Sequence, residues 1–406
     1  MIDIRPATAD EMGQLGTLTG YSYGGSFGDG PETKTATANQ PEWTLCAFDD
    51  GLLVSSFVTI PFTARMNGRP MAFGGVSGVA TRPDYRRRGL VRRLMTDATA
   101  TMRDQGQPIA GLWASQAAIY QRYGYSISSY RRSYRIDSAD IVFHDGDSGN
   151  GDVRWLDAES AFDEVRALYI SFVADRIGYL HRSRALWSFG VMDAPDEDGP
   201  VSVGLSHDSN GKPNGYVVYT LRADRVDNPA RAQELRIRDL VWLDLDAYRS
   251  LWSFVASHDL VGRVTWPDAP VDDPAEELLA EPRMLNIRDE EGTWVRIVDV
   301  APALAGRGYL SAGHGSIEVF GDDLAPWNNG KYSIETDGGE ASVERLGSSD
   351  TVDATLSVKA LGSLFTGMRS VQRLRSWGLI DADDDAMDRL GSLFATRFAP
   401  HTPDHY

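Results

Sequence analysis

Residues 79–94 read VATRPDYRRRGLVRRL, and this stretch decides how the first part of the chain folds. Five of the 40 basic residues of the chain lie between Arg86 and Arg93, around Gly89, directly after an apolar run. Pro83 disfavours a helical conformation at the residue before it, so a strand ends near Arg82 and a helix begins within Arg86–Gly89. The beginning of a helix exposes unpaired backbone N–H groups and a partial positive charge, which suit a phosphate.

The residue types in this loop favour an anion site. Gly89 leaves room for a ligand to approach the backbone, and the arginines add charged donors. Arginines in a first helical turn oppose the helix dipole, and an anionic ligand resolves that conflict. The alternative is a solvated basic helix that carries one glycine. The sequence around the loop has no G-x-G-x-x-G pattern, which argues against a Rossmann loop, and the absence of G-x-x-x-x-G-K-[ST] excludes a Walker A loop.

The composition is that of a soluble globular protein, with 42% hydrophobic and 24% charged residues, and 406 residues suggest two or three domains. The opening MIDIRPATADEM is unlike a secretory signal, and no run approaches the roughly 18 apolar residues of a membrane span. Cys46 is the single cysteine, which excludes an internal disulfide and a C-x-x-C metal site. We therefore expect a cytoplasmic protein without a metal.

The charge balance bears on possible partners. The chain has 58 acidic against 40 basic side chains, a formal net charge of -18. Such a protein repels nucleic acid and anionic membranes, and it attracts a cationic small molecule or a lysine-bearing peptide.

Hydrophobic patterns predict an α+β fold for the first 140 residues. An N-terminal strand and helix are followed by three strands joined by Asp-Gly and Asn-Gly turns, then by a helix, a strand, a short helix and a last alternating strand. The ranges are 43–48, 52–66 and 70–81 for the three strands, 87–102 for the helix, and 109–114, 115–124 and 125–136 for the rest.

The remainder divides into two further sections. The polar stretch 144–153 predicts a domain linker. Residues 235–259 repeat the strand, turn and helix rhythm of residues 73–97, but the Arg-Arg-Arg-Gly segment is replaced by Arg-Ser-Leu-Trp. This favours a second, related domain that has lost its basic loop, with chance similarity as the alternative. Residues from about 292 to 406 predict a few strands and amphipathic helices that fill a core of their own.

At the basic loop the chain resembles the GCN5-related N-acetyltransferases (GNATs), whose pyrophosphate loop reads [QR]-x-x-G-x-[GA]. Here it is Arg86-Arg87-Arg88-Gly89-Leu90-Val91, with valine in place of the small last residue. The run ASQAAIYQRYGY at 114–125 resembles the family's helix with a tyrosine before Gly-aromatic. Length and motifs are closer to one branch, the enhanced intracellular survival (Eis) acetyltransferases.

The resemblance implies the domain layout. It consists of two tandem GNAT-like domains, each a mixed sheet flanked by helices, followed by an α+β domain like sterol carrier proteins. We predict a cofactor-binding domain at 1–145, a second domain without a cofactor loop at 154–290, and the third domain at 291–406. The resemblance also implies a homo-oligomer, which is a hexamer built from trimers.

The resemblance further implies acetyl-CoA as co-substrate and assigns binding residues. The backbone of Val79, Ala80 and Thr81 pairs with the pantetheine arm, and Ser115 and Gln116 lie on its other side; simple helix capping is the alternative for Ser115. The pyrophosphate lies among Arg87, Arg88, Gly89, Leu90, Val91 and Arg92.

Tyr120 is the predicted general acid, because a phenol with a pKa of about 10 is protonated at neutral pH; the alternative is a packed aromatic. In the Eis branch the base is the terminal carboxylate, which here belongs to Tyr406. Pro400 and Pro403 stiffen its approach.

The implied acceptors are primary amines: aminoglycosides, polyamines or lysine side chains. Phe27 and Asp29 are candidates for holding such a cation, with a glycine-rich surface turn as the alternative. A different class of function is a lipid or hydrophobic-ligand binder that uses the third domain, with a regulatory GNAT domain.

Overall fold

The structure is a computed structural model of the 406-residue chain, and it describes residues 2–24, 39–195 and 198–406. The chain forms two compact units, neither of which is continuous in sequence. Unit 1 contains residues 1–128, 293–397 and Tyr406, and unit 2 contains residues 129–292 and 398–405.

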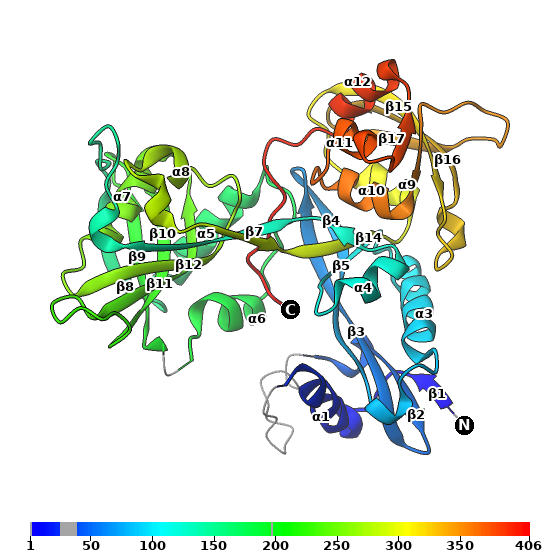
Figure 1. Ribbon diagram of the computed structural model, residues 1–406, viewed down its shortest axis with the longest axis horizontal. Coiled ribbons are helices and arrows are strands. Elements are labelled where there is room, and N and C mark those ends of the chain that lie inside the picture. The colour runs from blue at the N-terminus through cyan, green and yellow to red at the C-terminus, as the bar shows by residue number, and fades with distance from the viewer. Residues whose placement is uncertain (1, 25–38, 196–197) are drawn as a thin grey trace. The chain divides into compact units, whose positions relative to one another are not determined.

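The first sheet of unit 1 has seven strands in the order β1-β2-β3-β4-β5-β14-β6. Neighbouring strands are antiparallel except β4 and β5, which are parallel. The Asn67-Gly68 turn closes the long β3–β4 hairpin that is prominent in Figure 1. The strands are β1 (Ile2–Arg5), β2 (Thr44–Asp49), β3 (Leu52–Met66), β4 (Arg69–Thr81), β5 (Ile109–Trp113), β6 (Ser126–Ile127) and β14 (Thr293–Ile297).

Helices cover both faces of this sheet. On one face α1 (Met12–Tyr23) packs Leu15 and Leu18 against Val58 of β3. On the other face α3 (Leu90–Asp104) and α4 (Ala117–Tyr120) cover a separate apolar cluster that includes Leu94 and Met95. The crossover from β4 through α3 to β5 makes the parallel pair, as expected for a β-α-β connection.

Unit 1 also contains the third domain, a five-stranded sheet in the order β17-β16-β15-β18-β19 with four helices. The buried Arg296 of β14 donates two hydrogen bonds of 2.8 Å to Asp322, which joins this domain to the first sheet. Its elements are α9 (Val300–Gly306), β15 (Ala312–Phe320), β16 (Gly330–Asp337), β17 (Ala341–Arg345), β18 (Ala354–Ser357), α10 (Val358–Phe365), α11 (Val371–Ser376), β19 (Ile380–Ala382) and α12 (Asp384–Leu393).

Unit 2 has a second seven-stranded sheet in the order β13-β7-β12-β11-β10-β9-β8. Its only parallel pair is β11–β12, connected by α7 (Leu245–Ala256), which repeats the β4–α3–β5 arrangement and confirms the repeat that residues 235–259 indicate. The strands are β7 (Tyr130–Asp137), β8 (Asp152–Asp157), β9 (Val201–His207), β10 (Pro213–Arg222), β11 (Gln233–Trp242), β12 (Val261–Ala269) and β13 (Arg288–Glu291), with α5 (Phe162–Val173), α6 (Arg184–Leu186) and α8 (Ala275–Leu278).

Each seven-stranded sheet contains a strand that lies outside the residue range we predicted for its domain. Residues 125–136, expected to form one strand, divide at Ser128 into β6 of the first sheet and β7 of the second. Residues 288–297 divide at Gly292 in the same way. The stretch 144–153, predicted as a linker, lies inside unit 2, where Arg249 of α7 donates two 2.7 Å hydrogen bonds to Asp145.

The segment Phe398–His405 is part of unit 2 and is held by buried polar groups. The amide of His401 donates to the carbonyl of Ile177 at 3.0 Å. Arg182, 1% exposed at its side chain, donates to Asp404 at 2.8 Å and also pairs with Asp239. The chain is therefore fixed by charge two residues before Tyr406.

Candidate functional site

A bulge in β4 opens the first sheet at its parallel pair. β4 pairs with β5 only from Phe73 to Gly75, although β4 continues to Thr81. Further along β4, Gly78 and Val79 together face one residue of β3, and Gly78 has a φ of +56°, the left-handed conformation that glycine adopts in such bulges. Beyond Gly75, therefore, β4 no longer pairs with β5, and its edge toward β5 is left for another chain or ligand.

The loop after β4 places the arginines ahead of the helix. The strand ends at Thr81, and Arg82 is extended before Pro83, as predicted. The helix begins at Leu90 with Gly89 as N-cap, slightly later than predicted, because Arg87 and Gly89 have left-handed φ angles of +63° and +78° that an α-helix does not accept. Gly89 makes no side-chain cap, so the first amides of α3 have no capping partner.

The charge of this loop is open to solvent. Arg88 donates to the carbonyl of Asp84 at 2.7 Å and stacks over the Tyr85 ring, whose hydroxyl donates to Asp49. In residues 2–24, 39–195 and 198–406, no side chain pairs with the guanidinium groups of Arg87 or Arg92. A Cβ atom built at Gly89 would meet nothing within 4 Å. The loop thus presents a helix N-terminus and two unpaired cations on one accessible surface.

Tyr120, the predicted acid, is a buried phenol at the end of α4. It is 4% exposed, and its ring contacts Tyr125 edge-on at 6.0 Å between centroids. Burial, assisted by the neighbouring Tyr23 and opposed by a hydrogen bond with Ser115, raises the pKa of Tyr120 to about 12. The phenol therefore holds its proton at neutral pH and is available as a donor.

Ser115 and Gln116 lie between β5 and α4, across from the free edge of β4. Gln116 is the N-cap residue of α4, and its side chain makes no capping hydrogen bond. The Tyr23 hydroxyl donates to the carbonyl of Val79 at 3.0 Å, which brings α1 to the same place.

Tyr406 is seated on the first sheet, on the face that α1 covers. Its ring contacts Phe62 and Phe73 edge-on, at 5.0 and 6.2 Å between centroids. A Cβ atom on Gly75 would lie 2.4 Å from the Phe62 ring and 3.1 Å from the Tyr406 ring, so the glycine makes room for both rings. The prediction of an anchored aromatic end is thus matched by a specific aromatic seat.

Three contributors to this site were not predicted. Tyr23 lies at the end of α1, and no sequence motif marks it. Phe62 and Phe73 read as ordinary strand residues, although the Gly74-Gly75 pair is the kind of signal that marks close approach in a strand. Phe27 and Asp29, predicted to hold the acceptor, lie outside the described residues.

Family models match three parts of the chain. Residues 3–128 and residues 178–297 each match an acetyltransferase (GNAT) domain model, and residues 300–403 match a sterol carrier protein domain. An N-acetyltransferase Eis of Mycobacterium tuberculosis is 29% identical over 332 residues, 79% of this chain and 78% of the relative. The chain belongs to the GNAT acetyltransferases, in the Eis branch.

Two further relatives of the same type support this. An uncharacterized N-acetyltransferase of Streptomyces avermitilis is 29% identical over 352 residues, 85% of this chain and 83% of the relative. The crystal structure of Eis1 from Mycobacterium abscessus superposes over the whole of both chains with a TM-score of 0.82 and 26% identity. The Eis-type fold, two GNAT domains and a sterol-carrier-like domain, is therefore shown along the chain, and the protein is an acyltransferase.

Over the described ranges, no group of three or more His, Cys, Asp or Glu side chains is placed to hold a metal ion. Among the helices described, none combines the length and the apolar character needed to span a bilayer.

Proposed function

We propose that this protein transfers the acetyl group of acetyl-CoA to a primary amine of a cationic acceptor: an aminoglycoside, a polyamine or a lysine side chain. The observation that carries the proposal is the uncapped N-terminus of α3 at Gly89, beside two unpaired arginines and the free edge of β4. A helix N-terminus with open amides binds a pyrophosphate, and the guanidinium groups add charged hydrogen bonds.

The thioester is oriented by the two diverging strands. Val79, Ala80 and Thr81 at the end of β4 pair through their backbone with the amides of the pantetheine arm. Ser115 and Gln116 contact the arm from the β5 side. The bulge at Gly78 turns the strand so that the acyl carbon stops near Tyr120 rather than running along the sheet.

The chemical step is a transfer from sulfur to nitrogen. The acceptor amine attacks the thioester carbonyl carbon, the C–S bond breaks, and the thiolate takes the phenolic proton of Tyr120. Burial raises the pKa of Tyr120 to about 12, so the phenol is protonated at neutral pH and can donate a hydrogen bond to the sulfur as the C–S bond breaks.

The base is the α-carboxylate of Tyr406, which receives the proton that the amine loses. A carboxylate of this kind has a pKa of about 3.5, so it acts by holding the ammonium group and relaying its proton through water. This assignment is supported by the contacts of the Tyr406 ring with Phe62 and Phe73.

The acceptor class follows from charge. A protein with a net charge of -18 concentrates cations near its surface and speeds their association. The proposal also includes assembly into a homohexamer and a cytoplasmic location.

A thiol-release assay tests the proposal, with acetyl-CoA as donor and kanamycin, spermidine and a lysine peptide as acceptors. At least one amine accelerates CoA release by 100-fold or more over buffer. Tyr120→Phe lowers kcat by roughly 100-fold, the usual size of a lost general acid. The matched control is Tyr125→Phe, because the buried Tyr125 hydroxyl has no hydrogen-bond partner in the described structure, and its loss leaves kcat unchanged.

Removal of Tyr406 from the chain tests the proposed base independently of the proposed acid, Tyr120. We expect the shortened protein to bind CoA normally and to lose most of kcat with every amine. Unchanged turnover in a folded, shortened protein would refute the assignment of the base, and release of no CoA with any amine would refute the transferase itself.

A further inference from the structure

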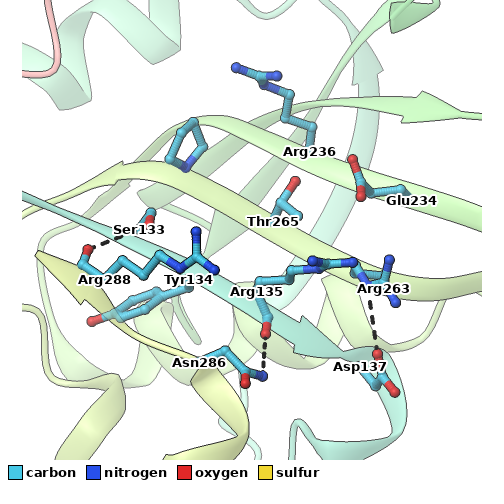
Figure 2. Close-up of a pocket in the computed structure, with 11 residues that line it drawn as sticks. Ser133, Tyr134, Arg135, Asp137, Glu234, Arg236, Arg263, Thr265, Asn286 and Arg288 are labelled. Carbon is cyan, nitrogen blue, oxygen red and sulfur yellow. Dashed lines mark hydrogen bonds and ion pairs between the residues drawn. The ribbon is translucent and has the colours of Figure 1, made fainter. Parts of the chain in front are cut away.

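Unit 2 has an open hollow of about 500 Å³ on the sheet face opposite α7, and none of its lining residues is among those assigned above. It is built on four adjacent strands, β11, β12, β7 and β13, and Figure 2 shows their side chains pointing into it. Its central residues are Ser133, Arg135, Arg236, Arg263, Thr265 and Arg288, and we call it the arginine hollow.

The strand register explains why the arginines gather there. Thr265 of β12 pairs with Arg236 of β11 on one side and with Arg135 of β7 on the other. Arg288 of β13 pairs with Ser133, two residues from Arg135 on the same face of β7. Because neighbouring strands lie about 4.8 Å apart, three arginines start within reach of one another around two hydroxyl groups.

The charge of the hollow is balanced at one end only. Arg263 faces Asp137 at 3.8 Å, and Glu234 pairs with Arg222 at 3.4 Å. Within the described ranges no acidic group pairs with Arg135, Arg236 or Arg288. None of these three arginines lies directly opposite another, but they share one face of the sheet without an acidic partner between them.

The next residue on the same face of β11 is affected by this charge. Burial, and then the positive charge of Arg236, lower the pKa of the Arg238 guanidinium. Arg238 donates to the carbonyls of Gly190, Val191 and Asp193, so it is committed to the protein.

The same position in the first sheet is chemically different. On the corresponding strand β4, Phe73 and Gly75 lie within the parallel pairing with β5, and they contact the Tyr406 ring. The shared fold therefore does not require arginines at this place. They are a property of the second sheet alone, in a chain with an excess of acidic residues.

We propose that the arginine hollow binds a small anion that carries two or more phosphate groups. A guanidinium group offers two parallel N–H donors to phosphate oxygens. The donors of three such groups exceed the number of hydrogen bonds that a single carboxylate can accept, so they favour an anion with more oxygens. The hydroxyl of Thr265 supplies a neutral donor at the base of the hollow, whereas the Ser133 hydroxyl donates to the carbonyl of Arg288 at 3.4 Å. The ligand offsets the positive charge of Arg135, Arg236 and Arg288. This site is independent of the proposed acetyl transfer.

Titration calorimetry with tripolyphosphate tests the proposal on the full-length chain carrying Arg87→Gln and Arg92→Gln, which weakens the basic loop of unit 1. We expect one binding site per chain. Arg135→Gln, Arg236→Gln and Arg288→Gln, added singly, each raise the dissociation constant roughly tenfold, the scale of one charged hydrogen-bonding group. Arg166→Gln is the matched control, because Arg166 is exposed on α5 of the same unit, and it leaves binding unchanged.

Two further titrations, with inorganic phosphate and with citrate, decide the class of ligand. Inorganic phosphate and citrate bind at least tenfold more weakly than tripolyphosphate. Equal affinity for citrate, no heat with tripolyphosphate, or the same loss from Arg166→Gln would overturn the proposal. Sedimentation of the triple variant is measured in parallel: a change in oligomeric mass without a change in tripolyphosphate binding would mean that the hollow is a contact between copies of this chain.

Discussion

The two GNAT sheets begin their crossover helices in opposite ways. At α3 the N-cap is Gly89, without a side chain, and unpaired arginines stand beside it. At α7 the N-cap is Asp244, whose carboxylate accepts from the amide of Ala247 at 2.8 Å, with Asp246 in the first turn. In unit 2 the protein supplies the anion that a helix N-terminus attracts, whereas in unit 1 that place is left open.

This difference shows where two sheets of the same fold diverge. Both sheets have the same strand order around one parallel pair. A few residues at the helix beginning separate a self-capped helix from an open cradle. The comparison also makes the two units suitable controls for each other.

The largest expected effect concerns Gly89. Gly89→Val forces a side chain onto a left-handed residue at the mouth of the cradle, and we expect CoA affinity to fall at least 100-fold, about 3 kcal/mol. Gly106, at the other end of α3, has a φ of +71° and equally open surroundings. Gly106→Val therefore suffers the same strain, and calorimetry should show normal CoA binding. Equal losses from both variants would mean that Gly89 acts only through stability.

A second effect belongs to the core of unit 2. Burial raises the pKa of Asp273 to about 6, against opposing hydrogen bonds from the Ala275 amide and the Tyr248 and Tyr134 hydroxyls. Between pH 4 and 6 the folded state then binds a proton that the unfolded state has lost. The free energy of unfolding of unit 2 falls as pH rises through this window, by about 3 kcal/mol, and is level above it.

Hydrogen exchange of the β12 amides at several pH values measures this dependence. Asp273→Asn should flatten it, and Asp259→Asn, at an exposed aspartate of the same unit, should leave it intact. If the pH dependence of exchange persists in Asp273→Asn, a group other than Asp273 causes it.

The smallest effect is at Asp244. Asp244→Ala removes the cap of α7 and should destabilise that helix by about 1 kcal/mol, seen as faster exchange of the amides at 245–256. CoA affinity should not change, because the cradle is in the other sheet. A loss of CoA binding in this variant would break the assignment of function to α3 alone.

The local features of this molecule could be predicted from sequence, and the pairings could not. The strand at 52–66, the strand end before Pro83 and the helix after Gly89 follow from alternation, proline and glycine within a few residues. The division of residues 125–136 at Ser128 was missed because alternation continues across the break while the pairing partners change from β14 to β12 and β13.

The candidate site shows the same limit. The basic loop and the segment around Tyr120 are contiguous motifs, which a single sequence can reveal. The seat of Tyr406 joins residues more than 300 positions apart, and the arginine hollow draws on four strands from 130 to 291. Such sites depend on strand register, which a single sequence does not reveal.

Calorimetric titration of CoA into two charge-reversed chains tests the open cradle most directly. Arg87→Glu with Arg92→Glu reverses two cations that have no partner in the described structure, and Arg166→Glu with Arg231→Glu makes the same change in net charge on exposed residues of unit 2. We predict one CoA per wild-type chain, a loss of at least 100-fold in the first variant and at most about twofold in the second. Absence of CoA binding by the folded wild-type chain, or equal affinity of the two variants, would contradict the cradle at Gly89.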